Sequence, residues 1–324
     1  MMYLSIIIPV YNTEIYLSEC IDSCLDLEKQ MDNFEIILVD DGSTDSSLSI
    51  CKDYKNKYSN IKVLSQENQK QGAARNYGLS IAKGNYIWFV DSDDTIQLNG
   101  FSKILKHLKI KLYDVVCFNG CEVNQNGDFL KNFNRFDKYS NEHKFSLISS
   151  RRNHNSSTPL CLFKKDFLKE HKLNFLPNIF FEDNEFLLRV FDLNPNSLFL
   201  KDVFYVIRLS LNSTTRTKKY ERFLDIFNTI DTLLRIRKKQ NSKIDVEMID
   251  LLILRNINSV LQSTLPSKVL FNKVCENLEK SKEIRIFFNS NYSLLNNIQI
   301  SLLNKPKILR TLMIIFYKIK QFKF

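Results

Sequence analysis

Short apolar runs alternate with polar segments through the first third of the chain. Runs rich in β-branched and aromatic residues predict buried strands, and four of them occur at 4–10, 34–39, 61–64 and 86–90. The intervening segments carry apolar residues at helical spacing, which predicts helices at about 14–27, 45–58 and 72–82. Asn12 or Thr13 is the expected cap of the first helix, and Ser43 or Thr44 that of the second. Strands that are nearly continuous in apolar residues, in alternation with helices, predict a parallel sheet covered on both faces.

The pattern is mixed from residue 97 to residue 209 and purely helical after about residue 220. Helices are predicted at 97–109, at 165–171 and from about 180, and strands at 114–119, 160–163 and 199–209. Beyond them, helices are predicted at roughly 220–239, 245–264, 267–288 and 306–322. We therefore expect a sheet-containing domain at 1–216 and a helical C-terminal region at 217–324.

Three carboxylates follow the fourth predicted strand almost directly. Asp91, Asp93 and Asp94 come after the apolar run 86–90, and the carboxyl ends of strands in open α/β sheets are where ligands bind. Carboxylates this close repel one another unless a cation lies between them. The stretch predicts a divalent-metal site for a phosphorylated ligand; the alternative is a solvated acidic turn that caps the next helix.

Glycine-rich phosphate loops are absent from the sequence. No Gly-x-Gly-x-x-Gly follows the first predicted strand, and there is no Gly-Lys-Ser/Thr loop. Neither dinucleotide binding nor Walker-type phosphate binding is therefore supported.

Positive charge is concentrated away from these acids. The net charge is +10, yet residues 1–110 hold 11 Lys and Arg against 15 Asp and Glu, a net of −4, so the remainder carries +14. Residues 305–324 combine six bases and no acid with apolar residues at helical spacing. This predicts an amphipathic helix on an anionic membrane surface; a docked C-terminal helix or a homo-oligomer interface is the alternative.

Other features of the sequence indicate the cellular location of the protein and its partners. The seven cysteines have no metal-ligand spacing, which favours buried, reduced thiols in a cytoplasmic protein. The first predicted strand begins at residue 4, so we expect no signal peptide. The sequence contains no apolar run of 18 residues, so we expect no membrane-spanning helix. Despite the charge, no nucleic-acid-binding motif occurs, and we expect no nucleic-acid partner.

Four blocks of sequence occur in a characteristic order. They are Ile6-Ile-Ile-Pro-Val-Tyr-Asn12, Val39-Asp-Asp-Gly-Ser-Thr-Asp45, Gly72-Ala-Ala-Arg-Asn76 and Val90-Asp-Ser-Asp-Asp94. Together they resemble glycosyltransferase family 2, and Glu182-Asp183 and Arg208 to Arg216 resemble later motifs of that family. The resemblance implies the GT-A fold, an α/β architecture with a Rossmann-like, mostly parallel central sheet and helices on both faces.

The resemblance also implies which residues hold the donor. Asp41 would accept a hydrogen bond from the uracil N3–H, with Asp40 beside it, and a turn or helix cap is the alternative for both. The residues expected around the base and ribose are Pro9, Tyr11 and Asn12.

Phosphate binding is expected from two basic groups of residues. Arg75 and Asn76 would lie near the base and phosphates at a helix N-terminus. Arg208, Ser213 and Arg216 resemble the loop that closes on the diphosphate. The alternative for both groups is a basic surface with ordinary ion pairs.

The sequence Asp91-Ser92-Asp93 resembles the family's Asp-x-Asp motif. Asp93 would bind Mn²⁺ or Mg²⁺, which bridges the diphosphate, and Asp91 would hold the ribose or the water shell of the metal. Ser92 is counted with the donor-binding residues, and Asp94 is an alternative metal ligand.

Asp183 is the candidate general base. It resembles the Asp of the family's Glu-Asp motif, and inversion at the anomeric carbon needs a carboxylate that deprotonates the acceptor hydroxyl. The alternative is that Glu182, Asp183 and Glu185 only complement the dipole of a helix N-terminus.

The sequence thus predicts an inverting, metal-dependent glycosyltransferase. It would move a hexose or N-acetylhexosamine from a UDP-sugar to a hydroxyl of a glycan or lipid-linked glycan, in bacterial capsule, lipopolysaccharide or teichoic acid synthesis. We expect it in the cytoplasm, or peripheral on the cytoplasmic face of the inner membrane. The alternative is a catalytically degenerate GT-A scaffold or binding subunit of a polysaccharide-synthesis complex.

Overall fold

The chain divides into two compact units, Met1–Thr217 and Lys218–Phe324, which are considered separately. The computed structural model describes residues 3–133, 157–209, 224–239, 242 and 246–264. Ser213, Arg216, the predicted helices at 267–288 and 306–322, and the basic segment 305–324 lie outside these described residues.

The first unit is built on a nine-stranded sheet in the order β3-β2-β1-β4-β8-β6-β9-β5, with β7 paired to β6. The parallel part is β1 (Leu4–Val10), β2 (Phe34–Asp40), β3 (Ile61–Ser65) and β4 (Tyr86–Phe89). The rest comprises β5 (Thr95–Ile96), β6 (Val115–Asn124), β7 (Phe129–Phe133), β8 (Cys161–Lys164) and β9 (Ser197–Leu209).

Strand β8 is the point at which the sheet becomes mixed. It runs antiparallel to both β4 and β6, whereas β6 and β9 are parallel to each other. The prediction of an α/β fold with a mostly parallel sheet is confirmed, and the antiparallel members lie in the half whose pattern is less regular.

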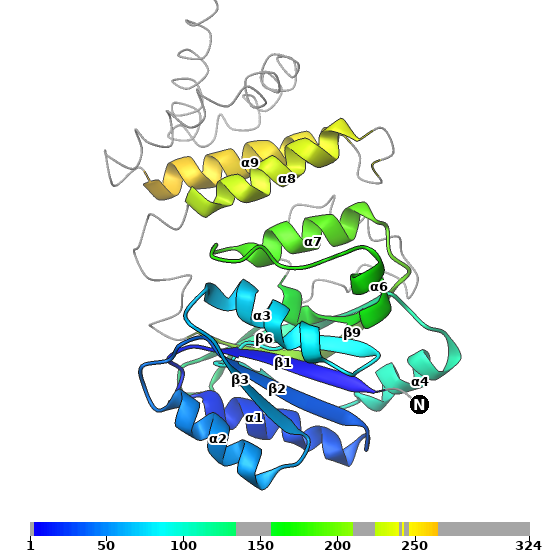
Figure 1. The fold of residues 1–324 in the computed structure, drawn as a ribbon. Helices are drawn as coiled ribbons and strands as arrows, with labels where there is room; N and C mark the ends of the chain where they lie inside the picture. Colours follow the sequence, from blue (N-terminus) through cyan, green and yellow to red (C-terminus); the bar gives the residue numbers. More distant parts are fainter. Residues whose placement is uncertain (1–2, 134–156, 210–223, 240–241, 243–245, 265–324) are drawn as a thin grey trace, which may run out of the picture. The chain divides into compact units, whose positions relative to one another are not determined.

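Helices cover both faces of the parallel strands (Figure 1). On one side lie α1 (Leu17–Leu25), the 3₁₀ helix η1 (Asp26–Lys29) and α2 (Ser47–Lys57); α3 (Lys70–Ile81) lies on the other. The remaining elements of this unit are α4 (Ser102–Ile110), η2 (Thr158–Leu160), α6 (Lys165–Glu170) and α7 (Glu182–Asp192). Ile6 and Ile8 of β1 share a core with Leu17 and Ile21 of α1, while Ile7 faces α3.

The second unit contains two described helices, α8 (Ile226–Lys238) and α9 (Val246–Thr264), which pack together. Arg237 of α8 forms an ion pair with Asp250 of α9 at 2.6 Å. Within the described residues, no helix is long and apolar enough to cross a bilayer.

Two predicted helix starts are wrong. Neither Thr13 nor Thr44 caps a helix, because α1 begins only at Leu17 and α2 at Ser47. These loop residues bind each other instead: Thr44 N–H donates to Asn12 Oδ1 at 2.8 Å, and Thr13 N–H donates to Ser47 Oγ at 2.9 Å. The helix predicted at 97–109 likewise starts late, at Ser102, and Gln97 N–H donates instead to Phe204 O of β9 at 3.0 Å.

Close packing of α3 on the sheet leads to a first prediction. A Cβ at Gly78 would lie 2.4 Å from Ile7 Cγ2, so Gly78→Ala forces the helix off β1. Alanine in a helix is ordinarily favoured by about 1 kcal/mol, but overpacking of a buried contact costs about 1–3 kcal/mol. We expect net destabilisation in urea titration. Ser80→Ala, on the exposed face of the same helix, is the control, and equal stability of both variants would contradict the prediction.

Candidate active site

The loops that follow β1, β2 and β4 meet at one edge of the sheet. These strands are parallel and in register, with Val10 opposite Asp40 and Ile7 opposite Phe89. The chain therefore delivers three of the four sequence blocks to the same edge, which is the ligand-binding edge of an open α/β sheet.

Asp40 and Asp41 are both buried but hold different partners. Asp40 accepts hydrogen bonds from Ser43 N–H at 3.2 Å and from Ser65 Oγ at 3.1 Å, so it braces the turn. Asp41 Oδ1 accepts from the Gln66 side chain and from Gln69 N–H, each at 2.8 Å. No described residue donates to Asp41 Oδ2, so this oxygen can accept a further hydrogen bond.

The end of β1 carries the other residues that were expected around the donor. Pro9 is buried in the strand, opposite Val39. Tyr11 is 48% exposed, and Asn12 has a φ of 52°, a left-handed conformation that asparagine tolerates. Asn12 ties this loop to the next one through Thr44, which leaves the Tyr11 ring as the open surface at this corner.

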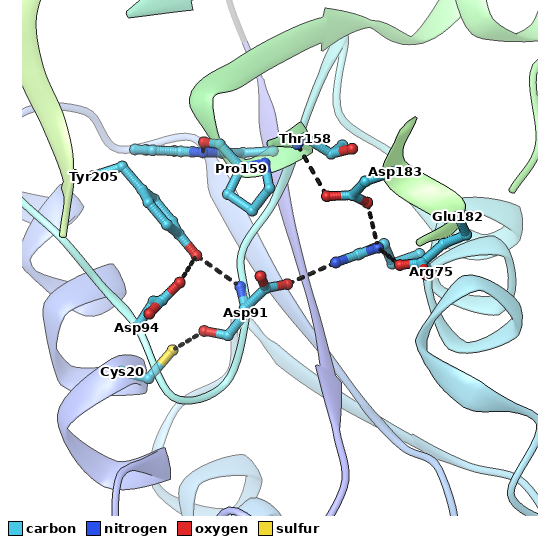
Figure 2. Close-up of polar contacts among 10 residues, drawn as sticks. Cys20, Arg75, Asp91, Asp94, Thr158, Pro159, Glu182, Asp183 and Tyr205 are labelled. Carbon is cyan, nitrogen blue, oxygen red and sulfur yellow. Dashed lines mark hydrogen bonds and ion pairs between the residues drawn. The ribbon is translucent and has the colours of Figure 1, made fainter. Parts of the chain in front are cut away.

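Arg75 is completely buried and contacts three carboxylates (Figure 2). Its Nη2 lies 2.7 Å from Asp91 Oδ1, and its Nη1 lies 2.5 Å from Glu182 Oε1 and 2.8 Å from Asp183 Oδ1. Burial alone would lower the pKa of Arg75, but the charges of the three carboxylates outweigh burial and raise the pKa. The guanidinium also lies over the Phe175 ring. Arg75 therefore joins the acid turn after β4 to the start of α7.

The expected place of Arg75 and Asn76 beside the base and phosphates stays a prediction, and the structure shows the protein groups that these side chains contact. Arg75 is engaged by protein carboxylates, and Asn76 is engaged by backbone: its side-chain amide donates to Phe175 O and accepts from Phe175 N–H, both at 2.8 Å. Both hydrogen-bonding sides of the Asn76 amide are thus used. Arg75 thus links carboxylates of two segments, and Asn76 links α3 to the backbone of Phe175.

The acid turn holds its three carboxylates in three different ways. Asp91 pairs with Arg75, and Asp94 is buried with both oxygens occupied, Oδ2 by Tyr205 Oη–H at 2.7 Å and Oδ1 by Arg208 N–H at 2.8 Å. Asp93 is half-buried, and no other described residue bonds its side chain. Burial, reinforced by the charge of Asp91, raises the pKa of Asp93 to about 6.

Ser92 faces the neighbouring loop. Its side chain is buried and accepts a hydrogen bond from Thr13 Oγ1 at 3.1 Å. Cys20 of α1 donates a hydrogen bond to the Asp91 carbonyl at 3.4 Å, so α1 also contacts the acid turn. Ser92 thus links the loop after β1 to the acid turn.

Asp183 occupies the first turn of α7 and is oriented from two sides. Its Oδ1 pairs with Arg75, and its Oδ2 accepts a hydrogen bond from Thr158 N–H of η2 at 3.1 Å. Its neighbour Glu182 is completely buried, and burial raises the pKa of Glu182 to about 7, with Arg75 opposing the rise and the Asp183 charge adding to it. Asp183 is the more open of the two, with about 20% of its side chain exposed.

Arg208 lies in β9 and is held by α1. Its Nη2 pairs with Glu19 at 2.6 Å, its Nη1 donates to Gln125 O at 3.2 Å, and its guanidinium lies over the Tyr16 ring. The role of Arg208 as a diphosphate ligand stays a prediction, as do the roles of Ser213 and Arg216, which lie outside the described residues.

Two residues and one contact of this network escaped the sequence interpretation: Tyr205, Thr158 and the contact between Arg75 and Glu182. Tyr205 is one tyrosine in an apolar strand, and Thr158 contributes a backbone N–H, which any residue except proline would supply. Only the Glu-Asp pair carried a signal, and its partner lies 107 positions earlier in the chain.

The described residues do not by themselves form a complete metal cage. Among them, no group of three or more His, Cys, Asp or Glu side chains is arranged to hold an ion. A Mg²⁺ or Mn²⁺ ion that takes most of its ligands from phosphates and water needs only one or two protein carboxylates. The half-buried, unpartnered Asp93 fits such a site.

Solved structures with the same architecture identify the fold. The chain aligns with S. aureus TarS in complex with UDP-GlcNAc, with a TM-score of 0.65 and 23% identity over 88% of this chain and 84% of that one. It also aligns with a mannosyltransferase from Pyrobaculum calidifontis in complex with GDP-Man and Mn²⁺, with a TM-score of 0.55 and 15% identity over 100% of this chain and 88% of that one. The fold is therefore the GT-A fold.

Sequence comparison then gives the family. The model for "Glycosyl transferase family 2" matches residues 5–172, slightly more than half of the chain. Glycosyltransferase GlyG of Streptococcus pneumoniae is 34% identical over 66% of this chain and 73% of its own length. The poly(ribitol-phosphate) β-glucosyltransferase of Bacillus spizizenii is 38% identical over 55% of this chain, but only 27% of its own length is matched. The chain belongs to glycosyltransferase family 2, and the prediction that it is a transferase is confirmed.

Proposed function

We propose that this chain is an inverting, metal-dependent glycosyltransferase that moves a hexose or N-acetylhexosamine from a UDP-sugar to an acceptor hydroxyl. The observation that carries the proposal is the Arg75 bridge, which binds Asp91 of the acid turn and Asp183 of α7 through the same guanidinium. A candidate donor site and a candidate base are thereby fixed with respect to each other, as a single displacement requires.

The donor would occupy the edge formed by the loops after β1, β2 and β4. Asp41 Oδ2 would accept the uracil N3–H, Tyr11 would pack against the base, and Pro9, Asn12 and Asp40 would hold the loops in place. A UDP donor is supported by the complex of the structural neighbour TarS with UDP-GlcNAc. The neighbour in complex with GDP-Man makes a GDP-sugar the competing donor to test.

Asp93 would be the protein ligand for Mn²⁺ or Mg²⁺, because Asp94 is buried with a donor on each oxygen and Asp91 is paired with Arg75, whereas Asp93 is half-buried and no other described residue bonds its side chain. The bound cation would neutralise charge on the leaving diphosphate. Asp91 is then best placed to bind the ribose or a water of the metal. This assignment selects Asp93 over Asp94, which the sequence had left open.

Asp183 would act as general base. An acceptor hydroxyl loses its proton to Asp183 as its oxygen bonds to the anomeric carbon, while the bond from that carbon to the diphosphate oxygen breaks and UDP leaves. Attack opposite the leaving group inverts the configuration. The two hydrogen bonds to Asp183 use one lone pair of each carboxylate oxygen, so acceptor sites remain for the incoming hydroxyl.

The acceptor would be a glycan or lipid-linked glycan of a bacterial surface polysaccharide. Supporting relatives include two minor teichoic acid biosynthesis proteins of Bacillus subtilis, GgaB and GgaA, which are 43% and 44% identical over about a third of this chain. We propose that the protein is located in the cytoplasm or at the cytoplasmic face of the membrane. Residues 1–216 would form the catalytic domain and residues 217–324 the helical C-terminal region. Within that region, the segment 305–324 would bind the membrane or form a homo-oligomer interface.

Thermal denaturation with nucleotides tests the donor proposal. A ligand at 100 times its Kd adds about 2.7 kcal/mol of stability, which for a domain of this size raises Tm by about 5 °C or more. We expect UDP with Mn²⁺ to produce this shift, UDP alone to produce less, and GDP to produce none. Stabilisation by GDP but not by UDP would overturn the UDP proposal.

The degenerate scaffold is the competing function. It predicts nucleotide binding without turnover, whereas the proposed enzyme should slowly hydrolyse a UDP-sugar when no acceptor is present, and only with the metal. Release of UDP from UDP-glucose and UDP-GlcNAc, with and without Mn²⁺, separates the two. Asp93→Asn is the background control, and wild-type release no higher than this background would favour the scaffold.

A further inference from the structure

The acid turn Asp91–Asp94 is held by a strand that comes more than a hundred residues later. The Tyr205 hydroxyl of β9 donates to Asp94 Oδ2 at 2.7 Å and accepts a hydrogen bond from Asp91 N–H at 3.1 Å (Figure 2). Tyr205 is completely buried. One phenol oxygen therefore connects the first residue of the turn to the last.

Strand β9 makes further contacts on the C-terminal side of the turn. Thr95 and Ile96 pair antiparallel with Val206 and Tyr205, and Arg208 N–H donates to Asp94 Oδ1. Both Asp94 oxygens thus receive a donor from the same strand. The chain immediately after the turn cannot shift unless these bonds break.

The requirements of this contact select tyrosine. A buried carboxylate needs donors and a buried backbone N–H needs an acceptor, and a hydroxyl can meet both needs at once. Phenylalanine would fill nearly the same volume but would leave Asp91 N–H and Asp94 Oδ2 without partners. Tyr205→Phe therefore removes the two hydrogen bonds of the hydroxyl and keeps the packing of the ring.

We propose that Tyr205 is a positioning residue for the divalent cation: by linking Asp91 N–H to Asp94, it sets the shape of the turn that presents Asp93. The inference rests on the proposed function, because it assumes that Asp93 is the metal ligand. It adds a determinant of metal affinity that lies in β9, outside every sequence block that resembles the family.

Removal of a group that orients a metal ligand typically weakens metal binding 10- to 100-fold. We expect Tyr205→Phe to raise the Kd for Mn²⁺ in the presence of saturating UDP by about tenfold or more. Affinity can be measured from the free Mn²⁺ signal in electron paramagnetic resonance, without any turnover. Urea titration of the same protein measures the accompanying loss of stability.

Tyr86→Phe is a matched control. Tyr86 is also buried, its hydroxyl donates to Tyr113 O at 2.7 Å and accepts from Tyr113 N–H at 3.2 Å, and it lies at the end of β4 remote from the acids. The two variants lose the same kind of bridging hydroxyl and should lose similar stability. Only Tyr205→Phe should weaken Mn²⁺ binding.

A second variant tests the same contact if Tyr205→Phe does not fold. Asp94→Asn should weaken Mn²⁺ binding about as much as Tyr205→Phe does, and far less than Asp93→Asn, if Asp94 orients the turn and does not bind the ion. A loss in Asp94→Asn equal to that in Asp93→Asn would make Asp94 a ligand and overturn the inference.

The remaining outcomes are distinct. Equal Mn²⁺ affinities for Tyr205→Phe and Tyr86→Phe would overturn the role of Tyr205 and leave the proposed function intact. Wild-type protein that binds no Mn²⁺ with UDP would instead overturn the proposed function, and the inference with it. A tenfold or greater loss confined to Tyr205→Phe, with stability matched to Tyr86→Phe, supports the inference.

Discussion

Asp183→Asn is expected to slow glycosyl transfer by about 10²- to 10⁴-fold, the range that a positioned general base contributes. Asparagine has the same shape but cannot take a proton from the acceptor hydroxyl. Donor binding should change little, because the proposed contacts to UDP and metal come from the loops after β1, β2 and β4. The measurement is the transfer rate with a bacterial wall glycan as acceptor, together with the Kd for UDP and Mn²⁺.

Glu185→Gln is the control for this prediction. Glu185 lies in the same first turn of α7 but pairs with Arg189, at 2.7 Å. If the acids of this turn only complement the helix dipole, each substitution should cost about 0.3–1 kcal/mol of stability, and neither should affect the chemistry. Transfer that survives in Asp183→Asn at the level of Glu185→Gln would place the base elsewhere.

Arg75→Met is expected to be the most destabilising single substitution among the site residues. Removing one partner of a buried ion pair costs about 3–5 kcal/mol, because the remaining charge stays buried and unpaired. Here three carboxylates lose a common partner at once. The variant should show a much lower urea midpoint, and Arg189→Met, which removes a less buried ion pair on α7, serves as the control.

The pH dependence of stability gives a second measure of this cluster. The folded-state pKa of Glu182 is about 7, above its ordinary value of 4.5, so the folded state binds more protons than the unfolded state between these values. Stability should therefore fall as pH rises from about 4.5 to about 7. Glu182→Gln should reduce this slope, most clearly between pH 6 and 7, where the raised pKa of Asp93 (about 6) contributes least. An unchanged slope in Glu182→Gln would contradict the assignment of the titration to Glu182.

Asp183→Asn and Arg75→Met each remove one partner of the ion pair between Arg75 and Asp183. Asp183→Asn removes a proton acceptor and leaves Arg75 bound to Asp91, whereas Arg75→Met releases both the acid turn and the base. Loss of Arg75 should therefore affect donor affinity and transfer together, while loss of Asp183 should affect transfer alone. This difference distinguishes a residue that organises the site from one that reacts in it.

Local pattern was sufficient for the first half of the fold. The strands β1, β2 and β4 are mostly apolar runs with every residue buried, and runs of this kind are recognisable without tertiary information. Helix starts were less predictable. Thr13 and Thr44 have the residue type of helix caps, but their loops lie side by side, and hydrogen bonds between the loops replaced the caps.

The sequence alone determined which residues stand at the ends of the strands: Asp40 and Asp41 at the end of β2, and Asp91, Asp93 and Asp94 after β4. These positions follow from periodicity along a single segment, so no tertiary contact is needed to find them. The family was also determined at this level, by the order of the four blocks.

Only the tertiary structure decided which groups each acid contacts. Asp94 meets Tyr205 across 111 positions, Arg75 meets Glu182 across 107, and Asn76 meets Phe175 across 99. A hydrogen bond depends on distances of a few tenths of an ångström, and residue spacing along the chain does not specify such distances between remote segments. Asp93 is therefore distinguished from Asp94 by the partners that β9 brings to the turn.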